Sequence, residues 1–344
     1  MPGPERARRG VWEALVDGSL TVEQIEARVA ERAPAFERVR AEVGKVIVGQ
    51  RGLVDRMLIG LLCDGHLLIE GNPGLAKTTA VTTLSRCLGL TSGRVQFTPD
   101  LLPADLVGTV VYRPATGDFV SRQGPIVTQI LLADEVNRAP PKVQSALLEA
   151  MQERQVTVGD KTTPLPRPFL VLATQNPIEQ EGTYPLPEAQ LDRFLLKVKV
   201  GYPTLEDEMQ IVLRSAAPKP DLTPVLSAEG IAETVALVRQ IRMTDALMRY
   251  VVGIVRATRD PGVVAKDLAR AVAVGASPRA SIALTAAARA RAFLDGRGYA
   301  LPEDVKAMAL DVLRHRVLPS VEAEADGLDS DRIVTRLLDA VDMP

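Results

Sequence analysis

The sequence predicts an α/β fold, in which a mostly parallel sheet is sandwiched by helices and followed by a smaller all-helical domain. Short apolar segments alternate with segments of helical periodicity before residue 203, as strands alternate with helices in such folds. After Ser227 only helical periodicity remains. Hydrophobic residues form 46% of the 344 residues but aromatic residues only 3%, so the cores depend on Leu, Val, Ile and Ala. This composition suits parallel sheets and helices better than a β-sandwich.

The expected strands are short apolar segments bounded by turn residues. They span residues 66–70, 94–97, 130–133, 169–173 and 195–200. In the last of these, Lys197 and Lys199 alternate with apolar residues, which indicates an exposed edge strand. The expected helices span residues 53–63, 78–88, 140–154, 227–240, 244–259, 277–294 and 302–313.

Two β-hairpins are expected to interrupt the sheet domain, at residues 110–120 and 156–165. In the second hairpin, Gly159 followed by Asp160 suits a two-residue type II′ turn. Insertions of this kind in an α/β core are usually surface loops with a function.

The chain divides by composition into successive regions. The expected regions are an N-terminal helical extension (1–36), the sheet domain (37–203), a proline-rich linker (204–226) and the helical domain (227–344). Thr21 and Gln24 form a capping box that predicts a short helix in the extension. The high charge density of this extension favours a solvated or docked helix outside any core.

Charge and composition argue against several classes of protein. The net charge of −2 and a pI of about 5.9 disfavour a general nucleic-acid binder, which usually carries a basic face. Cys63 and Cys87 do not suggest a disulfide framework, and a cytoplasmic location is the simple interpretation. His66 and His315 are too far apart to suggest a metal cluster, and we expect them to be packing or surface residues. No apolar segment approaches the roughly 20 residues of a membrane span.

The strongest chemical signal is the segment Gly71-Asn72-Pro73-Gly74-Leu75-Ala76-Lys77-Thr78. It follows an expected strand and opens an expected helix, so backbone N–H groups and the positive helix end converge on phosphates. Lys77 would reach the β- and γ-phosphates of a nucleotide, and Thr78 would bind Mg²⁺. Ala76 stands where the strict pattern has glycine, which is acceptable only if this residue does not need a positive φ. The alternative is a glycine-rich turn with an incidental Lys-Thr, which the strand–turn–helix context disfavours.

A second signal is the apolar strand 130–133, which ends in Asp134 and Glu135. Asp134 at a strand end can hold a metal ion, usually through water. Glu135 would polarise an attacking water as general base. Strands often end at acidic turns, so this motif alone is weak evidence. It becomes strong evidence for a nucleotide site because the phosphate-binding segment lies upstream.

Three further side chains are candidates with open alternatives. Asn176 follows a strand and can position water or contact a γ-phosphate, although an Asn before Pro177 is also a common turn residue. Arg279 lies in the first turn of a helix that begins at Ser277-Pro278, where a cation is mildly unfavourable, so either phosphate contact or a surface position explains it. Arg193 can reach a neighbouring subunit's nucleotide as an arginine finger, or form an intramolecular ion pair.

These segments together resemble the MoxR family of AAA+ ATPases, from Val43 to Leu318. The segments that carry the resemblance are Gly71–Thr78, Gln96–Pro103, Asp134–Pro141, Ala173–Pro177, Glu179–Phe194 and Gly275–Ala280. The resemblance implies an AAA+ P-loop core with two hairpin inserts, the helix-2 insert and the pre-sensor-1 insert, and a C-terminal helical lid domain. It also implies ATP/ADP and Mg²⁺ as cofactors, a hexameric homo-oligomeric ring, and chaperone-like action on client proteins with a von Willebrand factor A domain.

The resemblance assigns a role to each candidate residue. The residues that it implies to contact nucleotide are Val48, Gly49, Gln50, Asn72, Pro73, Gly74, Leu75, Ala76, Lys77, Thr78, Thr79 and Arg279. Thr78 and Asp134 would hold the metal, with Glu135 as the Walker B base. The remaining catalytic residues, besides Lys77, are Asn176 as sensor 1, Arg193 as arginine finger and Arg279 as sensor 2. Arg138 belongs to the shared strings, but no role for it follows.

The expected mechanism places ATP between the two domains. Arg193 of a neighbouring protomer completes the site, and loss of the γ-phosphate releases Arg279 and Asn176, so that the lid rotates. The alternatives are a nucleic-acid motor, a magnesium-chelatase-like motor subunit, and a nucleotide-switched scaffold with little turnover. The acidic pI argues against the first, and the intact Asp134-Glu135 pair argues against the last.

Overall fold

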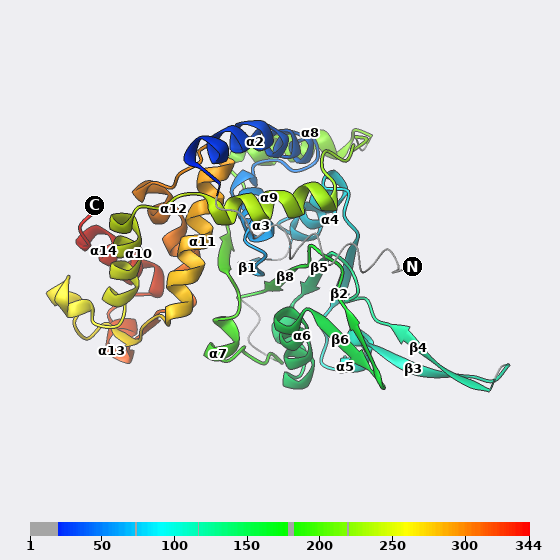
Figure 1. Ribbon diagram of the computed structural model, residues 1–344. Helices are drawn as coiled ribbons and strands as arrows, with labels where there is room; N and C mark the ends of the chain where they lie inside the picture. The colour runs from blue at the N-terminus through cyan, green and yellow to red at the C-terminus, as the bar shows by residue number, and fades with distance from the viewer. Residues whose placement is uncertain (1–19, 73, 116, 178–181, 219) are drawn as a thin grey trace. The chain divides into compact units, whose positions relative to one another are not determined.

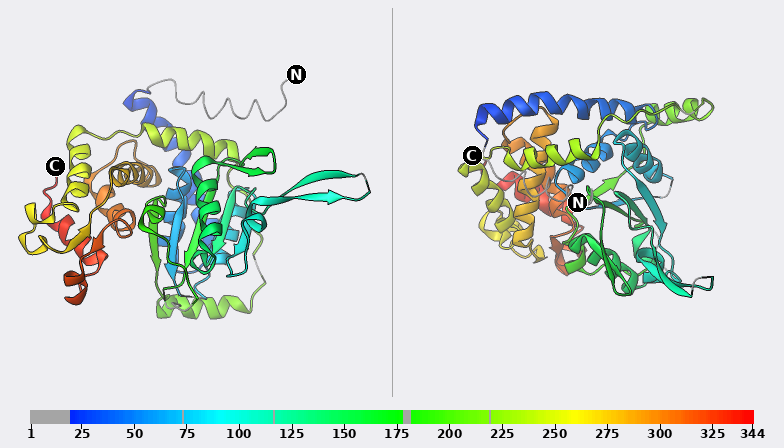
Figure 2. Two further views of the ribbon diagram at one scale, coloured as in Figure 1. Left: turned by 90° about the horizontal axis from the view of Figure 1, so that it is seen from below. Right: turned by 45° about the vertical axis from the view of Figure 1, so that its right-hand side comes forward.

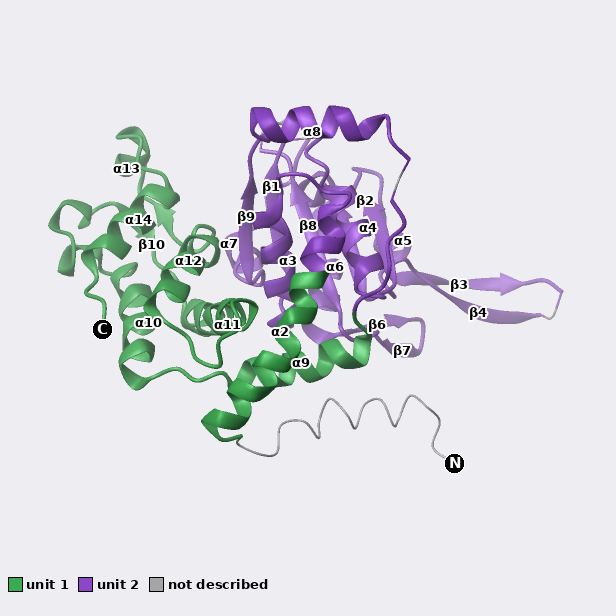
Figure 3. Cartoon of the chain, turned by 90° about the horizontal axis from the view of Figure 1, so that it is seen from above, with its two compact units in different colours: residues 1–38, 226–344 green, residues 39–225 purple. Residues whose placement is uncertain are grey.

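The computed structural model describes residues 20–72, 74–115, 117–177, 182–218 and 220–344. The chain forms two compact units, which Figure 3 shows in different colours. One is Val39–Val225, called here the sheet unit. The other joins Met1–Arg38 to Leu226–Pro344 and is called the helical unit.

The sheet unit is built on an entirely parallel sheet, as predicted. Its strand order is β2-β5-β8-β1-β9. The strands are β1 (Leu67–Gly71), β2 (Ser92–Gln96), β5 (Ile130–Asp134), β8 (Leu170–Gln175) and β9 (Leu196–Val200). The three central strands carry runs of fully buried apolar residues, as parallel strands covered on both faces do. The edge strand predicted from Lys197 and Lys199 is β9, and Lys197 pairs with Glu70 of β1 at 2.6 Å.

The helices of the sheet unit surround this sheet, as Figure 1 shows. They are α3 (Arg51–Leu62), α4 (Lys77–Cys87), α5 (Pro103–Val107), α6 (Pro141–Glu153), α7 (Glu188–Leu191) and α8 (Leu205–Ser215), with the 3₁₀ turn η1 (Val136–Arg138). Helices α3, α4 and α6 confirm the predicted helices. Each of them buries a face of apolar residues against the sheet, which is why their periodicity is visible in the sequence.

Both predicted hairpins are present. They pair β3 (Gly108–Arg113) with β4 (Asp118–Gln123), and β6 (Gln155–Val158) with β7 (Lys161–Pro164). Gly159 has a φ of 60°, which a type II′ turn requires at its first central residue. The β3–β4 hairpin projects away from the sheet in every view (Figures 1 and 2).

Two expectations about region boundaries need correction. The expected linker 204–226 contains α8, which Thr204 caps by accepting the N–H of Asp207 at 3.2 Å. None of the residues of α8 is buried, so no core-facing stripe distinguished it from a linker. The expected extension 1–36 is not separate either, because its helix α2 (Val22–Gly44) continues without a break past residue 36.

Helix α2 also contradicts the expectation that this region lies outside any core. Its capping box is confirmed, with Gln24 N–H donating to Thr21 at 3.3 Å and Thr21 N–H donating to Gln24 at 3.0 Å. The helix then buries an apolar stripe of Ile25, Val29, Ala33, Phe36, Val39 and Val43. Phe36 packs edge-to-face on Phe293 with ring centroids 5.2 Å apart. The charged residues on the opposite face of α2 masked this stripe in the overall composition.

The helical unit confirms the predicted lid helices as α9 (Ala228–Gln240), α10 (Asp245–Ala257), α11 (Pro278–Leu294) and α12 (Pro302–Leu313). Their first turns are capped by Ser227, Thr244 and Ser277, each accepting a backbone N–H. Elements that we did not predict are η2 (Pro261–Val263), η3 (Lys266–Leu268), β10 (Val272–Val274), β11 (Leu318–Pro319), α13 (Val321–Ala325) and α14 (Ser330–Ala340). Among the described residues, no helix combines the length and apolar character needed to cross a bilayer.

His66 is a packing residue at the start of β1, in line with one of the two roles expected for it. Its Nδ1 accepts the backbone N–H of Val171 at 3.0 Å, so Nε2 carries the proton and donates to the Met151 carbonyl at 3.1 Å. Burial lowers the pKa of His66 to about 3, and the nearby Arg154 charge acts in the same direction. The neutral ring therefore links β1, β8 and α6.

This environment predicts an acid-sensitive step in the stability of the sheet unit. The unfolded His66 binds a proton below its ordinary pKa of about 6.5, whereas the native residue stays neutral until about pH 3. Native stability is therefore fully present above pH 6.5 and falls as the pH drops below it. We expect His66 to contribute a loss of about 1.4 kcal/mol between pH 7.5 and 5.5. Urea unfolding at both pH values measures this loss, and His66→Gln, which keeps a donor and an acceptor, should lack it. Equal losses in both proteins would contradict the assignment.

Candidate functional site

The phosphate-binding segment predicted from the sequence lies between β1 and α4. Strand β1 ends at Gly71, where an added Cβ would come within 2.8 Å of the Val200 carbonyl, so a side chain does not fit. The Lys77 ammonium donates to the Gly71 carbonyl at 2.5 Å. Burial lowers the pKa of Lys77, although the charges of Asp134 and Glu135 oppose this effect. Pro73 lies outside the described residues.

Ala76 has a positive φ, so the expectation that this position does not need one is wrong. It has φ 55° and ψ 20°, in the left-handed region, and is the N-cap of α4. The strict pattern has glycine at this position because glycine adopts this conformation without strain. The chain therefore carries backbone strain directly beside Lys77.

Asp134 ends β5 with both carboxylate oxygens engaged. One oxygen accepts the Thr174 hydroxyl at 2.6 Å. The other accepts two nitrogens of the Arg94 guanidinium, at 2.8 and 3.2 Å. Arg94 projects from β2, the strand next to β5, and its side chain is 52% exposed. Asp134 is therefore bound by side chains from both neighbouring strands. The exposed Arg94 side chain has space to move away from it.

Glu135 follows immediately in a left-handed conformation, with φ 56° and ψ 51°. Its backbone N–H donates to the same Thr174 hydroxyl oxygen at 2.9 Å. Its carboxylate accepts the Gln96 amide at 2.7 Å and the Arg138 guanidinium at 3.1 Å. Arg138, for which the sequence suggested no role, thus forms an ion pair with Glu135.

Strand register explains why these groups meet. Gln96 lies beside Asp134 across β2 and β5, and Glu70 lies beside Gln175 across β1 and β8. Because parallel strands place their carboxyl ends at one edge, the ends of β2, β5, β8 and β1 gather their polar residues there. Asn176 follows β8 directly and is buried, with 7% of its surface exposed. The sheet therefore brings together Lys77, Asp134, Glu135 and Asn176.

Three other predicted positions have contacts of their own. Arg193 is exposed and donates to the Leu148 carbonyl at 3.4 Å, and among the described residues we find no ion pair for it. Arg279 is exposed in the helical unit, where its backbone N–H donates to Ser277 at 3.2 Å. Gly49, between Val48 and Gln50 at the start of α3, has a φ of 72° and leaves no space for a Cβ beside the Asp207 carboxylate.

Sequence reasoning missed four side chains that contact predicted site residues. These are Arg94, Gln96, Thr174 and Tyr202. The Tyr202 hydroxyl accepts the Asn72 amide at 2.8 Å. Arg94 and Gln96 lie on an expected strand and Thr174 follows another, so polar side chains at strand ends were the available signal. Their pairing required the order of the strands, which the sequence does not display.

Comparisons with known proteins decide the family. Residues 66–196 match the model of the "ATPase family associated with various cellular activities (AAA)", and residues 264–337 match that of the AAA lid domain. "Chaperone MoxR1" of Mycobacterium tuberculosis is 49% identical over 317 residues, which cover 92% of this chain and 84% of the relative. The chain belongs to the MoxR family of AAA+ ATPases.

Two further matches extend over nearly the whole chain. "Uncharacterized protein YeaC" of Bacillus subtilis is 42% identical over 90% of this chain and 95% of the relative. A crystal structure of a Cytophaga hutchinsonii protein assigned as an ATPase superposes with a TM-score of 0.87 at 45% identity, over 94% of this chain and 98% of that one. The AAA+ core and lid predicted for this MoxR-family chain are thus both present.

The strain at Ala76 predicts a stabilising substitution. Ala76→Gly removes the steric cost of the left-handed conformation, about 1–2 kcal/mol. Glycine also gives the unfolded chain more conformational entropy, which offsets part of this gain in stability. We expect the unfolding free energy of the sheet unit to rise by about 0.5–1 kcal/mol, measured by urea unfolding. Ala80→Gly, within the right-handed turn that follows, should instead lower it by about 1 kcal/mol or more. Destabilisation by both substitutions would rule out strain at Ala76.

The Arg94–Asp134 pair predicts an effect on divalent cations. A cation that reaches Asp134 must displace the Arg94 guanidinium, so Arg94→Ala should strengthen Mn²⁺ binding in the presence of ADP by roughly three- to tenfold. Electron paramagnetic resonance of free Mn²⁺ measures the affinity without turnover. Arg94→Lys retains the charge and should lie closer to the wild type. Unchanged or weaker Mn²⁺ binding by Arg94→Ala would show that the pair does not compete with the metal.

Proposed function

We propose that this MoxR-family protein hydrolyses Mg-ATP in a ring and uses the energy to remodel client proteins. The observation that supports this most directly is that Lys77, Asp134, Glu135 and Asn176 follow or end strands at one edge of the sheet, with the Thr174 hydroxyl joining Asp134 to Glu135. These are the residue types that phosphoryl transfer to water requires: a cation, a metal ligand, a base and a polar amide.

The residues present fit Mg-ATP. The Thr78 hydroxyl and the Asp134 carboxylate are hard oxygen ligands of the kind that Mg²⁺ prefers. The close approach of Gly71 and Val200 and the start of α4 at Lys77 suit a phosphate held by backbone N–H groups, with further contacts from Asn72, Gly74, Leu75, Ala76 and Thr79. Thr78 and Asp134 would hold Mg²⁺, which would neutralise negative charge on the phosphates. We assign the adenine contacts to Val48, Gly49 and Gln50.

In the proposed reaction, Glu135 takes the proton of the water that attacks the γ-phosphate. The Thr174 hydroxyl accepts the Glu135 backbone N–H and so restrains the backbone from which this carboxylate projects. Lys77 exchanges its Gly71 carbonyl for phosphate oxygens, and Asn176 orients the water. Arg193 from a neighbouring protomer and Arg279 stabilise the developing charge.

A second function is favoured by the contacts of Glu135. Gln96 and Arg138 both donate to one oxygen of its carboxylate, and such hydrogen bonds make a carboxylate a weaker base toward water. This arrangement supports a nucleotide-dependent switch that hydrolyses ATP appreciably only when a client or partner releases Glu135. A client with a von Willebrand factor A domain, a hexameric ring and a cytoplasmic location remain parts of the proposal that rest on the family.

The proposed function predicts a shared active site. We expect Glu135→Gln to lower ATP turnover at least about a hundredfold, because general-base catalysis supplies about 10²–10⁴ in rate. Arg193→Ala should be similarly inactive alone. If Arg193 acts on the neighbour's nucleotide, mixing the two inactive variants should restore part of the turnover, because mixed rings contain sites with both residues intact. Turnover per protomer should also rise with protein concentration.

Other outcomes separate the two candidate functions. Normal turnover by Glu135→Gln would remove it as the base. Absence of recovery in the mixture, with rings confirmed by light scattering, would place Arg193 outside a shared site. Tight ATP binding without turnover at any concentration, together with faster turnover after Gln96→Ala, would favour the switch.

A further inference from the structure

The two hairpins of the sheet unit face each other across a cleft. Strand register places Val110, Ser121 and Gln123 on one face of the β3–β4 hairpin, because Val110 lies opposite Ser121 and residues two apart share a face. On the β6–β7 hairpin, Val158 lies opposite Lys161 in the same way. The cleft between these faces has a volume of about 260 Å³ and is lined by Ser121, Gln123, Val156, Val158, Lys161 and Thr163.

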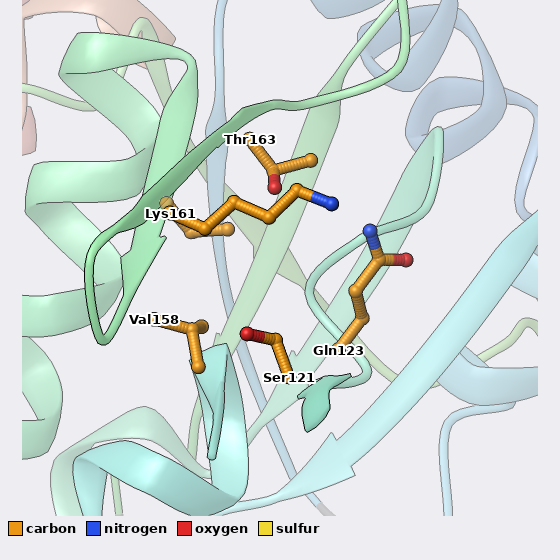
Figure 4. Close-up of a pocket in the computed structure, with 6 residues that line it drawn as sticks. Ser121, Gln123, Val158, Lys161 and Thr163 are labelled. Atoms are coloured by element: carbon orange, nitrogen blue, oxygen red, sulfur yellow. The ribbon is translucent and has the colours of Figure 1, made fainter. Parts of the chain in front are cut away.

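Contacts at the base of the cleft set its shape. The turn at Gly159 approaches Val110, since a Cβ on Gly159 would lie 3.0 Å from the Val110 side chain. Val156 and Val158 are buried, with 5% and 9% of their surface exposed, and form an apolar floor. Figure 4 shows the Lys161 side chain extending from its strand toward Gln123, with the Thr163 and Ser121 side chains nearby. The cleft thus combines an apolar floor with an ammonium group, an amide and two hydroxyls.

Lys161 brings a charge that this part of the protein does not neutralise. Its side chain is exposed, and it forms no ion pair with any residue that the structure describes. A cation beside hydroxyl and amide donors is the arrangement that recognises a carboxylate. A single cation is little for a nucleic-acid backbone, whose binding rests on several neutralised phosphates.

An aromatic pair continues the same face toward the tip of the hairpin. Tyr112 and Phe119 lie opposite each other in the register, with ring centroids 5.2 Å apart. They are 52% and 74% exposed. Phe119 is two residues from Ser121 and four from Gln123 along β4, or roughly 7–13 Å in an extended strand. The distance between the aromatic pair and the polar groups of the cleft is therefore one that two to four residues of an extended peptide span.

We propose that the face formed by both hairpins binds an extended segment of a client polypeptide in which an acidic side chain lies two to four residues from an aromatic one. The carboxylate enters the cleft beside Lys161, and the aromatic side chain packs on Tyr112 and Phe119. This inference rests on the proposed function, because it assigns to the client the chemistry that the hairpins recognise. It concerns binding alone and requires no chemical step.

The test uses the full-length protein in the presence of ADP and two fluorescein-labelled twelve-residue peptides of Ser and Thr. One peptide contains a Phe and an Asp four residues apart, and the other has Asn in place of Asp. Fluorescence anisotropy should show that the Asp peptide binds roughly three- to tenfold more tightly than the Asn peptide. Lys161→Gln should abolish this preference, and Lys161→Arg should retain it. Phe119→Ser should weaken both peptides.

Controls separate this site from general electrostatics and from the ATPase proposal. Lys142→Gln removes an exposed lysine on α6, outside the cleft, and should leave the preference unchanged. Equal binding of the two peptides by the wild type, or an unchanged preference in Lys161→Gln, would overturn the inference. So would tighter binding of a labelled oligothymidylate that depends on Lys161. Peptide binding is read without turnover, so an inactive ATPase that retains the preference would refute the proposed function and not the cleft.

Discussion

The Thr174 hydroxyl is the contact on which the geometry of the candidate site depends. It donates to the Asp134 carboxylate and accepts the Glu135 backbone N–H, so one side chain of β8 positions the two acidic residues that end β5. This is possible because β8 lies between β5 and β1 in a parallel sheet, where adjacent strands end at the same edge. The same order brings the Lys77 segment, which follows β1, to the other side of β8.

Two of the four described non-glycine residues with a positive φ lie beside the candidate site. Ala76 before Lys77 and Glu135 after Asp134 are both left-handed without being glycine. Such conformations cost of order 1–3 kcal/mol each and persist only where surrounding contacts determine them. The Thr174 bond holds Glu135, and the buried His66, which bonds to β8 and α6, stabilises the strands beneath. The site is therefore strained at its edge and supported by a well-packed sheet.

Three side chains from neighbouring elements bind the carboxylates of the acidic pair. Arg94 on β2 binds one oxygen of Asp134, whereas Gln96 on β2 and Arg138 both bind one oxygen of Glu135. An exposed guanidinium bound to a carboxylate contributes little to stability, so a metal ion or water can replace it at a small cost in free energy. The hairpins that face each other across the Lys161 cleft belong to the same compact unit as β2 and β5, so packed elements connect the proposed client site to the acidic pair.

The sequence by itself determined the five strands of the parallel sheet, most helices, both hairpins and the residues of the nucleotide motifs, because burial imposes periodicity and turns impose residue types. It also revealed the capping box of α2 and the start of α11 at Ser277-Pro278. It did not show that α2 is a core helix or that α8 exists, because the charged face of one and the unburied surface of the other obscure the periodic signal. Only the tertiary structure decided the pairing of Arg94, Gln96 and Thr174 with the acidic residues. Strand order and register are long-range properties, and contacts between residues forty positions apart leave no local pattern in the chain.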